Sequence, residues 1–384
     1  MEEALLTESV GLRTKVFRKM EEISPAEWNR VFPDVLESRS FFKTLDESGF
    51  EQFSFYYILV YEGDTPVGAA TCFRMDYPLD TTAGGQLKNV FSAVKKFSPH
   101  AFDLKVLICG LPMGQGRIGV VGENSERIVH ALVEAMERIA REEKVAIIAF
   151  KDFGSEQAPL LDPLRQRGFH KFESLPSTKL DIRFANFEEY LKTLSKATRY
   201  DLRRKFKKVE NLTQVDLEVT HGPDGTLDQV YRLYLQTKAK SDTQFENLPK
   251  EFFSHLSKNM PGKVKYFFWR IDQQLVAFAV SLVSGDLFLD YYIGLDYSVA
   301  YDYHLYFLRF RDMMNWCIEN KIKRYEMGNT SYEPKKRLGF ELVPFFVYFK
   351  HRHPLINPFF KILAVLLKPQ NFDEDLKKMK RGGS

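Results

Sequence analysis

Tyr332 is the residue of this sequence with the clearest capacity for chemistry. It stands shortly after Asn329, at the end of a strand predicted over residues 324–327, and open α/β sheets bind ligands at the carboxyl ends of their strands. A phenol with an ordinary pKa of about 10 is protonated at neutral pH and can give its proton to a departing group. The same pattern also fits a packing role for Tyr332 under a short helix predicted over 332–337, with Asn329 as the cap of that helix.

Two sets of cations could hold an anion. The stretch 190–208 contains eight Lys or Arg and one acid, and on a helix Arg199 and Arg203 lie beside an apolar stripe. Such a flank could bind a phosphate, an anionic lipid headgroup or RNA, or it could be a solvated face. Lys335 and Lys336, in the predicted short helix, could bind a phosphate or an acidic acceptor, or simply be exposed.

Three carboxylates beside the same strands are candidate general bases: Asp290, Asp296 and Asp302. A general base must lie within hydrogen-bond reach of the proton that it removes. The pattern singles out none of the three, and Asp302 could simply cap the long helix predicted over 302–319.

A glycine-rich segment, Gly114 to Gly119, precedes a helix predicted over 125–143. Glycine lets the backbone approach a pyrophosphate, and the start of a helix offers free N–H groups. Residues 120–125 separate the glycines from that helix, so a turn that leaves a strand is the alternative interpretation.

The elements that must position these residues occur twice. Each half shows a predicted hairpin, a third strand, a glycine-containing loop, a long helix, a strand, a short helix and a Gly-Phe pair. The strands that lead to the Gly-Phe pairs are 145–150 and 324–327. We therefore expect an α/β (α+β) chain of two similar domains, each with a mixed, mostly antiparallel sheet. The expected division is into residues 1–180, residues 181–352, and a tail over 353–384 that is apolar and then basic.

The composition excludes several classes of protein. With 44% hydrophobic and 28% charged residues, the 384-residue chain is not a disordered one. A net charge of +4 is too small to indicate nucleic-acid binding by itself. Cys72, Cys109 and Cys317 lie far apart, and His351 and His353 have no third ligand, so we expect neither a disulfide framework nor a metal site.

The sequence also bears on location. The first ten residues are acidic and have no apolar run, so no signal peptide is expected. No window reaches the roughly 18–20 apolar residues of a membrane span. We expect a cytoplasmic protein, with peripheral contact to the inner membrane face if the apolar run 354–368 is an interfacial helix rather than a packed one.

Several of these patterns resemble those of a known family. Asn329, Tyr332 and Gly339-Phe340 resemble the final motif of the GNAT acyltransferase superfamily. Gly114 to Gly119 resembles the acyl-CoA pyrophosphate loop of that family, and the run from Leu194 to Arg204 resembles the opening of the second domain in FemAB-like tandem GNAT proteins.

A longer part of the second half is similar to one branch of that superfamily. The run from Tyr291 to Asp296, with Gly328 and the stretch from Tyr332 to Gly339, resembles the CelD/BioF-type acetyltransferase domain. The resemblance covers residues 190–350 and reaches the first half only through its plan and one loop. It implies two tandem domains of the acyl-CoA N-acyltransferase type.

The resemblance implies an N-acyltransferase that uses acyl-CoA, such as acetyl-CoA, and no metal. The acceptor would be an amine of a small molecule or envelope precursor (an amino sugar, an amino acid or a peptide), and no nucleic acid would be bound. The reaction centre would lie where strands 287–293 and 324–327 splay apart. The implied site residues are Tyr332 and Asn329 for catalysis, Gly294, Ser298, Tyr303, His304, Lys335 and Lys336 for the cofactor, and Arg199 and Arg203 for the acceptor or a phosphate.

Two alternatives stay open. The loop from Gly294 to His304 is not glycine-rich and contains no Arg, which departs from the usual GNAT pattern. A non-catalytic binding protein with GNAT folds would fit that loop. A FemAB-like transferase that takes its aminoacyl group from tRNA would fit the basic stretch, although the helices predicted within 220–260 are too short for the long helical hairpin that FemAB proteins often carry.

Overall fold

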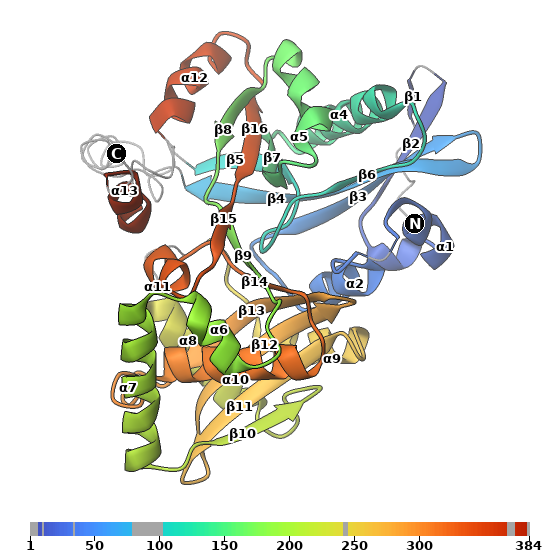
Figure 1. Cartoon of the computed structure of the whole chain (residues 1–384). Helices are drawn as coiled ribbons and strands as arrows, with labels where there is room; N and C mark the ends of the chain where they lie inside the picture. The colour runs from blue at the N-terminus through green and yellow to red at the C-terminus, as the bar shows by residue number, and fades with distance from the viewer. Residues whose placement is uncertain are drawn as a thin grey trace. The chain divides into compact units, whose positions relative to one another are not determined.

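The chain folds into two compact units that are not contiguous in sequence. The structure is a computed structural model that describes residues 7–9, 11–33, 35–78, 103–240, 245–366 and 373–381. Unit 1 comprises Met1–Pro33, Phe50–Pro176 and Pro344–Ser384, and unit 2 comprises Asp34–Gly49 and Ser177–Val343. Each unit contains one mixed sheet with helices packed against it, as Figure 1 shows.

Unit 1 has a nine-stranded sheet in the order β1-β2-β3-β4-β5-β7-β16-β8, with β6 paired to β4. Its neighbouring strands are antiparallel, except that β5 and β7 are parallel. The strands are β1 (Thr7–Ser9), β2 (Leu12–Phe17), β3 (Ser54–Glu62), β4 (Thr65–Pro78), β5 (Asp103–Cys109), β6 (Ile118–Val120), β7 (Ile147–Gly154), β8 (His170–Glu173) and β16 (Phe345–His351).

The helices of unit 1 begin and end largely where capping and apolar period place them. Ser24 caps α1 through the Glu27 backbone N–H at 3.2 Å, and the Glu27 carboxylate accepts in return from the Ser24 N–H. The long helix α4 buries an apolar face that includes Ile128, Leu132 and Met136. The helices are η1 (Met20–Glu22), α1 (Pro25–Val31), α4 (Ser125–Glu142), α5 (Ala158–Leu161), η3 (Asp162–Arg167), α12 (Asn357–Leu366) and α13 (Glu374–Arg381).

Unit 2 has a seven-stranded sheet in the order β10-β11-β12-β13-β14-β9-β15, in which only β13 and β14 are parallel neighbours among the described strands. The strands are β9 (Ser177–Asp181), β10 (Asp216–Thr220), β11 (Val264–Ile271), β12 (Gln274–Ser284), β13 (Leu287–Leu295), β14 (Arg324–Met327) and β15 (Glu341–Val343).

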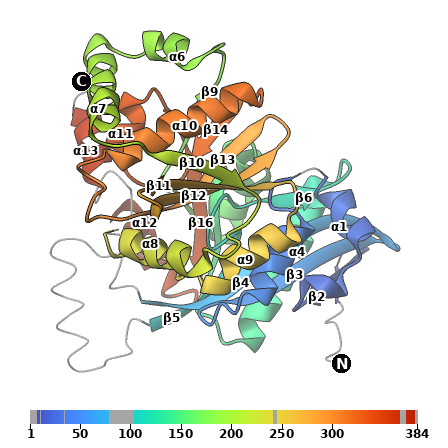
Figure 2. The same cartoon turned by 90° about the horizontal axis from the view of Figure 1, so that it is seen from below.

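Helices cover both faces of the unit 2 sheet. Figure 2 shows α6, α7 and α10 on one side and α8 and α9 on the other. The helices are α2 (Arg39–Glu47), α6 (Phe187–Thr193), α7 (Lys196–Leu212), α8 (Leu227–Ala239), α9 (Lys250–Asn259), α10 (Leu305–Glu319) and α11 (Tyr332–Arg337).

The two units repeat one order of elements, which confirms the expected duplication and the mixed, mostly antiparallel sheets. The predicted equivalence of strands 145–150 and 324–327 is confirmed too, because β7 and β14 are each the parallel neighbour of the strand before the long helix. Each sheet also takes one strand from the other half of the sequence. β9 follows β8 along the chain but pairs with β14, and β16 follows β15 but pairs with β7 and β8.

This exchange explains how the observed units differ from the contiguous ranges 1–180, 181–352 and 353–384. The first unit ends at Pro176, because β9 belongs to the second sheet. Residues from Pro344 onward return to unit 1 with β16. Helix α2 belongs to unit 2, where Asn259 Nδ2 of α9 donates to Glu47 Oε2 at 2.7 Å.

The apolar run expected over 354–368 forms α12 in part, and residues 367 and 368 lie outside the described residues. Phe360 packs against Phe349 of β16, with ring centroids 5.9 Å apart, whereas Leu355 and Phe359 are 76% and 69% exposed. No described helix is both long and apolar enough to cross a bilayer. Within the described ranges, no three His, Cys, Asp or Glu side chains are placed to hold a metal ion.

Candidate active site

The parallel pair β13–β14 opens in the middle of the unit 2 sheet. The two strands pair from Leu287–Arg324 to Asp290–Met327. β14 ends there, whereas β13 runs on to Leu295. Among the described residues no strand pairs with this edge of β13 beyond Asp290, so the backbone groups on this edge lack a ladder partner. An open row of N–H groups can polarise a carbonyl oxygen.

A β-bulge lies at the same place on the other edge of β13. Asp290 pairs with Ser281 of β12 and Tyr292 pairs with Val280, so Tyr291 is the extra residue of the bulge. A bulge bends the strand and changes the direction of its side chains. The opening and the bulge therefore coincide at Tyr291.

Helix α8 fixes the end of β13 and the loop that follows it. The Leu295 N–H donates to Thr237 Oγ1 at 2.9 Å, and the Tyr297 N–H donates to Gln236 Oε1 at 3.2 Å. Gly294 is buried, and a Cβ there would lie 2.7 Å from the Leu233 carbonyl carbon. Close packing of α8 thus accounts for glycine at position 294, which we expected to bind the cofactor.

The start of α10 lies in cationic surroundings. His304, the residue that precedes α10, has a left-handed backbone with φ 47°. Burial, and then the positive charges of Lys208 and Lys205 on α7, lower the pKa of His304. The expected cofactor residues Ser298 and Tyr303 lie in the loop before it, exposed and half-buried respectively. The structure thus brings three of the expected cofactor residues to one loop and adds cations from another helix.

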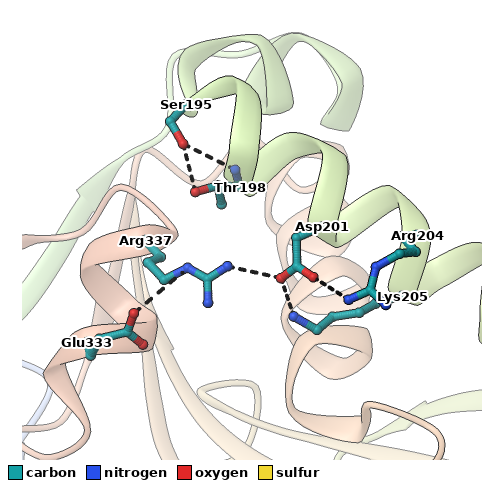
Figure 3. Close-up of polar contacts among 7 residues, drawn as sticks. All are labelled: Ser195, Thr198, Asp201, Arg204, Lys205, Glu333 and Arg337. Atoms are coloured by element: carbon teal, nitrogen blue, oxygen red, sulfur yellow. Dashed lines mark hydrogen bonds and ion pairs between the residues drawn. The ribbon is translucent and has the colours of Figure 1, made fainter.

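Helix α7 is also tied to α11 through Asp201. Figure 3 shows this carboxylate bound by Arg204, Lys205 and Arg337, the last at 2.9 Å from Asp201 Oδ2. Burial alone would raise the pKa of Asp201, but hydrogen bonds from Lys205 and Arg204 hold it well below its usual range. Ser195 caps α7 through the Thr198 N–H at 3.1 Å.

The structure gives Arg199 and Arg203 partners within unit 2. Arg199 Nη1 donates to carbonyl oxygens at the end of α6, including that of Lys192 at 3.3 Å. Arg203 forms an exposed ion pair with Glu188, a kind of contact that stabilises a fold by about 1 kcal/mol at most. Both side chains thus hold α6 against α7. Binding of an acceptor or phosphate by these two residues stays a prediction.

Tyr332 lies at the start of α11, beside the opening. Its side chain is fully buried, and its hydroxyl donates to the backbone carbonyl of Asn329 at 2.7 Å. Ser331, with φ 55°, precedes the helix, and no side chain caps it, so the expectation that Asn329 caps α11 is wrong. The hydroxyl of Tyr332 closes the turn between β14 and α11.

Lys335 is the buried cation of this site. It is 5% exposed, and its Nζ donates to the carbonyl of Gly328, the residue after β14. Burial lowers its pKa to about 7, although the charge of Asp290 raises it in part. Lys336 is exposed. The expectation that these lysines are simply exposed is therefore right for Lys336 and wrong for Lys335.

The three candidate bases differ in what they contact. Asp290 is buried and accepts from Arg309 Nη1 at 2.7 Å. Asp296 accepts from the Ser298 N–H at 3.0 Å and so closes a loop turn. Asp302 is exposed and does not cap α10, which begins at Leu305. None of the three therefore combines exposure with a place at the opening.

The glycine-rich segment of unit 1 is not at the start of a helix. β6 and the residues after it separate Gly119 from α4, which begins at Ser125. A Cβ at Gly116 would lie 2.1 Å from the Lys151 carbonyl oxygen, and the Gly116 N–H donates to the Asp152 carbonyl at 2.9 Å. The segment packs along β7, so a phosphate loop is the wrong interpretation and the turn after a strand is the right one.

One polar pair at the opening is not among the candidate site residues that the sequence suggests. Tyr292 of β13 donates through its hydroxyl to Glu246 Oε1 at 2.7 Å. Glu246 lies between α8 and α9, which pack on the face opposite α10. No motif marks Glu246 in the sequence, since only the fold brings the α8–α9 segment to β13.

Residues 196–336 match the family model of the acetyltransferase (GNAT) domain. A curated relative, "Putative 8-amino-7-oxononanoate synthase 2" of Mycobacterium tuberculosis, is 24% identical over 326 residues, which cover 81% of this chain and 41% of that protein. The chain thus spans about two fifths of the length of the curated relatives that it matches.

Two solved structures share the fold of this chain over both units. FemX covers 89% of this chain and 98% of its own, with 14% identity and a TM-score of 0.57. A tandem GNAT protein from the clavulanic acid biosynthesis pathway covers 89% and 99%, with 11% identity and a TM-score of 0.52. The chain therefore has the fold of these tandem GNAT proteins, and residues 196–336 of its second half match the acetyltransferase (GNAT) domain.

Proposed function

We propose that this chain is an N-acyltransferase that moves an acyl group from acyl-CoA to an amine at the β13–β14 opening. The observation that carries the proposal is the unpaired edge of β13 beyond Asp290, inside the matched acetyltransferase domain. Acyl-CoA supplies the activated thioester. The N–H groups on this edge offer hydrogen bonds to its carbonyl oxygen, which gains negative charge when an amine attacks.

The start of α10 fits the pyrophosphate of CoA. A helix N-terminus favours negative charge, and Lys208 and Lys205 add positive charge next to His304. Lys208 is exposed and forms no ion pair with any carboxylate in the described ranges, so its ammonium group is available to a phosphate. We assign Ser298, Tyr303 and His304 to this end of the cofactor, and exposed Lys336 to a peripheral phosphate.

Lys335 is the proposed proton donor. In the transfer, the lone pair of the neutral acceptor nitrogen attacks the carbonyl carbon, the C–N bond forms and the C–S bond breaks. The thiolate takes up a proton from Lys335, and the acceptor nitrogen loses one proton to water. An ammonium group at Lys335 lies beside the opening and, with a pKa of about 7, can release its proton near neutral pH. The same charge would stabilise the oxygen of the intermediate.

The geometry of Tyr332 fits a role in positioning the turn after β14 better than the role of the acid. Its proton is directed at the Asn329 carbonyl, and the side chain is fully buried. We propose that Tyr332 and Asn329 hold the turn that carries Gly328, to which Lys335 is bonded. If Tyr332 were the acid instead, Tyr332→Phe would lower turnover much more than the loss of a positioning hydrogen bond would.

The proposal is tested by binding and by turnover. Acetyl-CoA, longer acyl-CoAs and free CoA are added to the full chain, and the melting temperature is measured against ligand concentration. We expect stabilisation by all CoA species, and release of free thiol when acetyl-CoA is mixed with a panel of amino sugars, amino acids and peptides. No stabilisation at millimolar ligand would contradict the proposal and favour a non-catalytic binding protein.

The exposed cations of α7 favour a second candidate function, a FemAB-like transferase. The chain has the fold of FemX, and α7 exposes Lys196, Arg203, Lys207 and Lys208 along one helix. A FemAB-like enzyme would use this surface for an aminoacyl-tRNA, although α8 and α9 form no long hairpin. Binding of charged tRNA that weakens steeply with salt, without binding of acyl-CoA, would favour this function.

We propose in addition that α12 contacts an anionic membrane surface. Leu355, Ile356 and Phe359 are exposed apolar side chains at its start, and Lys361 is exposed on the same helix. Replacement of Leu355 and Phe359 by Ser should reduce partition into anionic vesicles at least fivefold. Unchanged partition would contradict the proposal.

A further inference from the structure

Glu246 is held at the edge of the opening by the sheet itself. The Tyr292 hydroxyl donates to Glu246 Oε1 at 2.7 Å, and Tyr292 lies on the part of β13 that has passed its last rung with β14. Burial and the nearby charge of Glu246 raise the pKa of Tyr292 far above its usual value, so the phenol stays a donor. The carboxylate is thus fixed in place and keeps its second oxygen.

The charge of Glu246 has no cationic partner in the described part of the chain. Within the described ranges no Lys or Arg forms an ion pair with it, and Lys238, a cation of the same region, donates to Asn247 instead. Asp201 in the same unit shows the opposite case, with three cations around one carboxylate. A half-buried carboxylate without a cation favours a positively charged ligand.

Aromatic rings surround this position. Tyr291, the residue of the bulge, contacts Tyr292 with ring centroids 4.8 Å apart, Phe41 at 6.2 Å and Phe252 at 6.5 Å. Burial, and then the charges of Glu37 and Glu246, raise the pKa of Tyr291 well above its usual value. Aromatic faces attract cations, so the rings and the carboxylate favour the same kind of ligand.

We propose that the acceptor binds as a primary ammonium ion in a subsite formed by Glu246, Tyr292 and Tyr291, and that the bound ion loses one proton to water before its nitrogen attacks the thioester. The inference rests on the proposed acyl transfer, because it places the amine nitrogen beside the unpaired edge of β13. It excludes alcohols and anionic acceptors as preferred substrates. It also explains why Tyr292 donates to Glu246: the hydrogen bond orients the carboxylate toward the opening.

The test uses two probes of equal shape, n-hexylammonium and 1-hexanol, titrated into the full chain with and without acetyl-CoA and followed by ligand-observed NMR. We expect the ammonium ion to bind at least fivefold more tightly than the alcohol at pH 7. Glu246→Gln should weaken the ammonium ion about tenfold and leave the alcohol unchanged. Tyr292→Phe should weaken it by a smaller factor, because the carboxylate is still present. Glu251→Gln, an exposed acid in the first turn of α9, is the matched control and should have no effect.

Two results would overturn the inference: equal binding of both probes, including no binding of either, or an ammonium preference that survives in Glu246→Gln. Acetyl-CoA binding is read separately from the melting temperature of the same variants. If the ammonium preference depends on Glu246 but acetyl-CoA does not bind, the subsite stands and the proposed acyl donor is wrong. If acetyl-CoA binds without any ammonium preference, the donor stands and the subsite is wrong.

Discussion

The parallel strand pairs of the two units end differently. In unit 1 the last rung joins Cys109 of β5 to Phe150 of β7, and β5 stops there. The chain leaves the sheet at Gly110 and then returns to the side of β7, where Gly116 forms a parallel bridge to Phe153. In unit 2 the last rung is Asp290–Met327, and β13 continues to Leu295 beside an unpaired edge.

Beyond the last rung of the parallel pair, unit 1 thus fills the gap between the strands with its own backbone, whereas unit 2 leaves the gap open. Gly110 and Gly116 make the filling possible, since a Cβ at either would lie within 3 Å of the Lys151 carbonyl oxygen. In unit 1 these backbone N–H and C=O groups are bonded within the chain. In unit 2 the corresponding groups of β13 are available to a ligand. For this reason the proposed transfer is placed in unit 2, and the same position in unit 1 is given a structural role.

The largest expected effect comes from Lys335→Met, which keeps the length of the side chain and removes its charge. If Lys335 gives the proton, turnover should fall about 10²–10³-fold with little change in acyl-CoA affinity. Steady-state kinetics and acetyl-CoA titration measure the two effects. Lys323→Met, at an exposed lysine just before β14, is the control and should retain turnover. Wild-type turnover in Lys335→Met would remove the proposed donor.

The same variant has a pH signature. The pKa of Lys335 in the folded state is about 7 and its ordinary value is 10.5, so the unfolded chain binds the extra proton between these values. The free energy of unfolding of the wild type should therefore rise with pH across this window through this group. Lys335→Met should be more stable by about 1–4 kcal/mol near pH 7, and that gain should vanish near pH 10.5. A gain independent of pH would show that Lys335 is not buried as a cation.

A pair of glycine substitutions compares the filled gap with the open one. Gly116→Ala places a Cβ 2.1 Å from the Lys151 carbonyl oxygen, whereas nothing lies within 4 Å of a Cβ at Gly328. Urea unfolding should show a loss of roughly 1–3 kcal/mol for Gly116→Ala and a change within about 0.5 kcal/mol for Gly328→Ala. Equal effects would mean that the two gaps do not differ as described.

A charge removal on α7 tests the cofactor end of unit 2. Lys208→Ala should weaken acetyl-CoA binding about three- to tenfold, because it removes one charge beside His304. Calorimetric titration at two salt concentrations measures this, and the loss should shrink at high salt. Lys258→Ala, an exposed lysine of α9, is the control. An equal effect of both variants would point to a general charge effect.

The smallest expected effect on turnover is that of Tyr332→Phe. Removing the hydroxyl breaks the hydrogen bond to Asn329, which should cost about 1 kcal/mol of stability and less than tenfold in turnover. Thermal unfolding and kinetics measure both. A loss of 10²-fold or more in turnover, with unchanged acyl-CoA affinity, would assign the acid role to Tyr332 and take it from Lys335.

Most of the elements could be predicted from the sequence. The strand 324–327 and the helix 332–337 have the observed bounds, because apolar period and turn residues act locally. The exchange of β9 and β16 could not be predicted, since strand pairing depends on partners far along the chain. The same limit applies to α2, which belongs to unit 2 although residues 39–47 fall within the expected first range, 1–180.

The site was predictable only where a motif carries it. Lys335 and Tyr332 follow the family pattern, but the burial of Lys335 comes from packing that no pattern shows. Gly294 has a packing role that a glycine in a loop motif does not reveal. Glu246 lies 46 positions from Tyr292, and no short motif links a loop residue to a strand so far away.

The most direct test of the difference between the two gaps is hydrogen–deuterium exchange of the full chain with and without acetyl-CoA, read by mass spectrometry. A ligand at the β13–β14 opening protects the backbone N–H groups that it binds. We predict slower exchange over residues 291–298 and 304–308 and no change over 110–119. Protection over 110–119, or none over 291–298 at saturating acetyl-CoA, would contradict the assignment of acyl-CoA to unit 2.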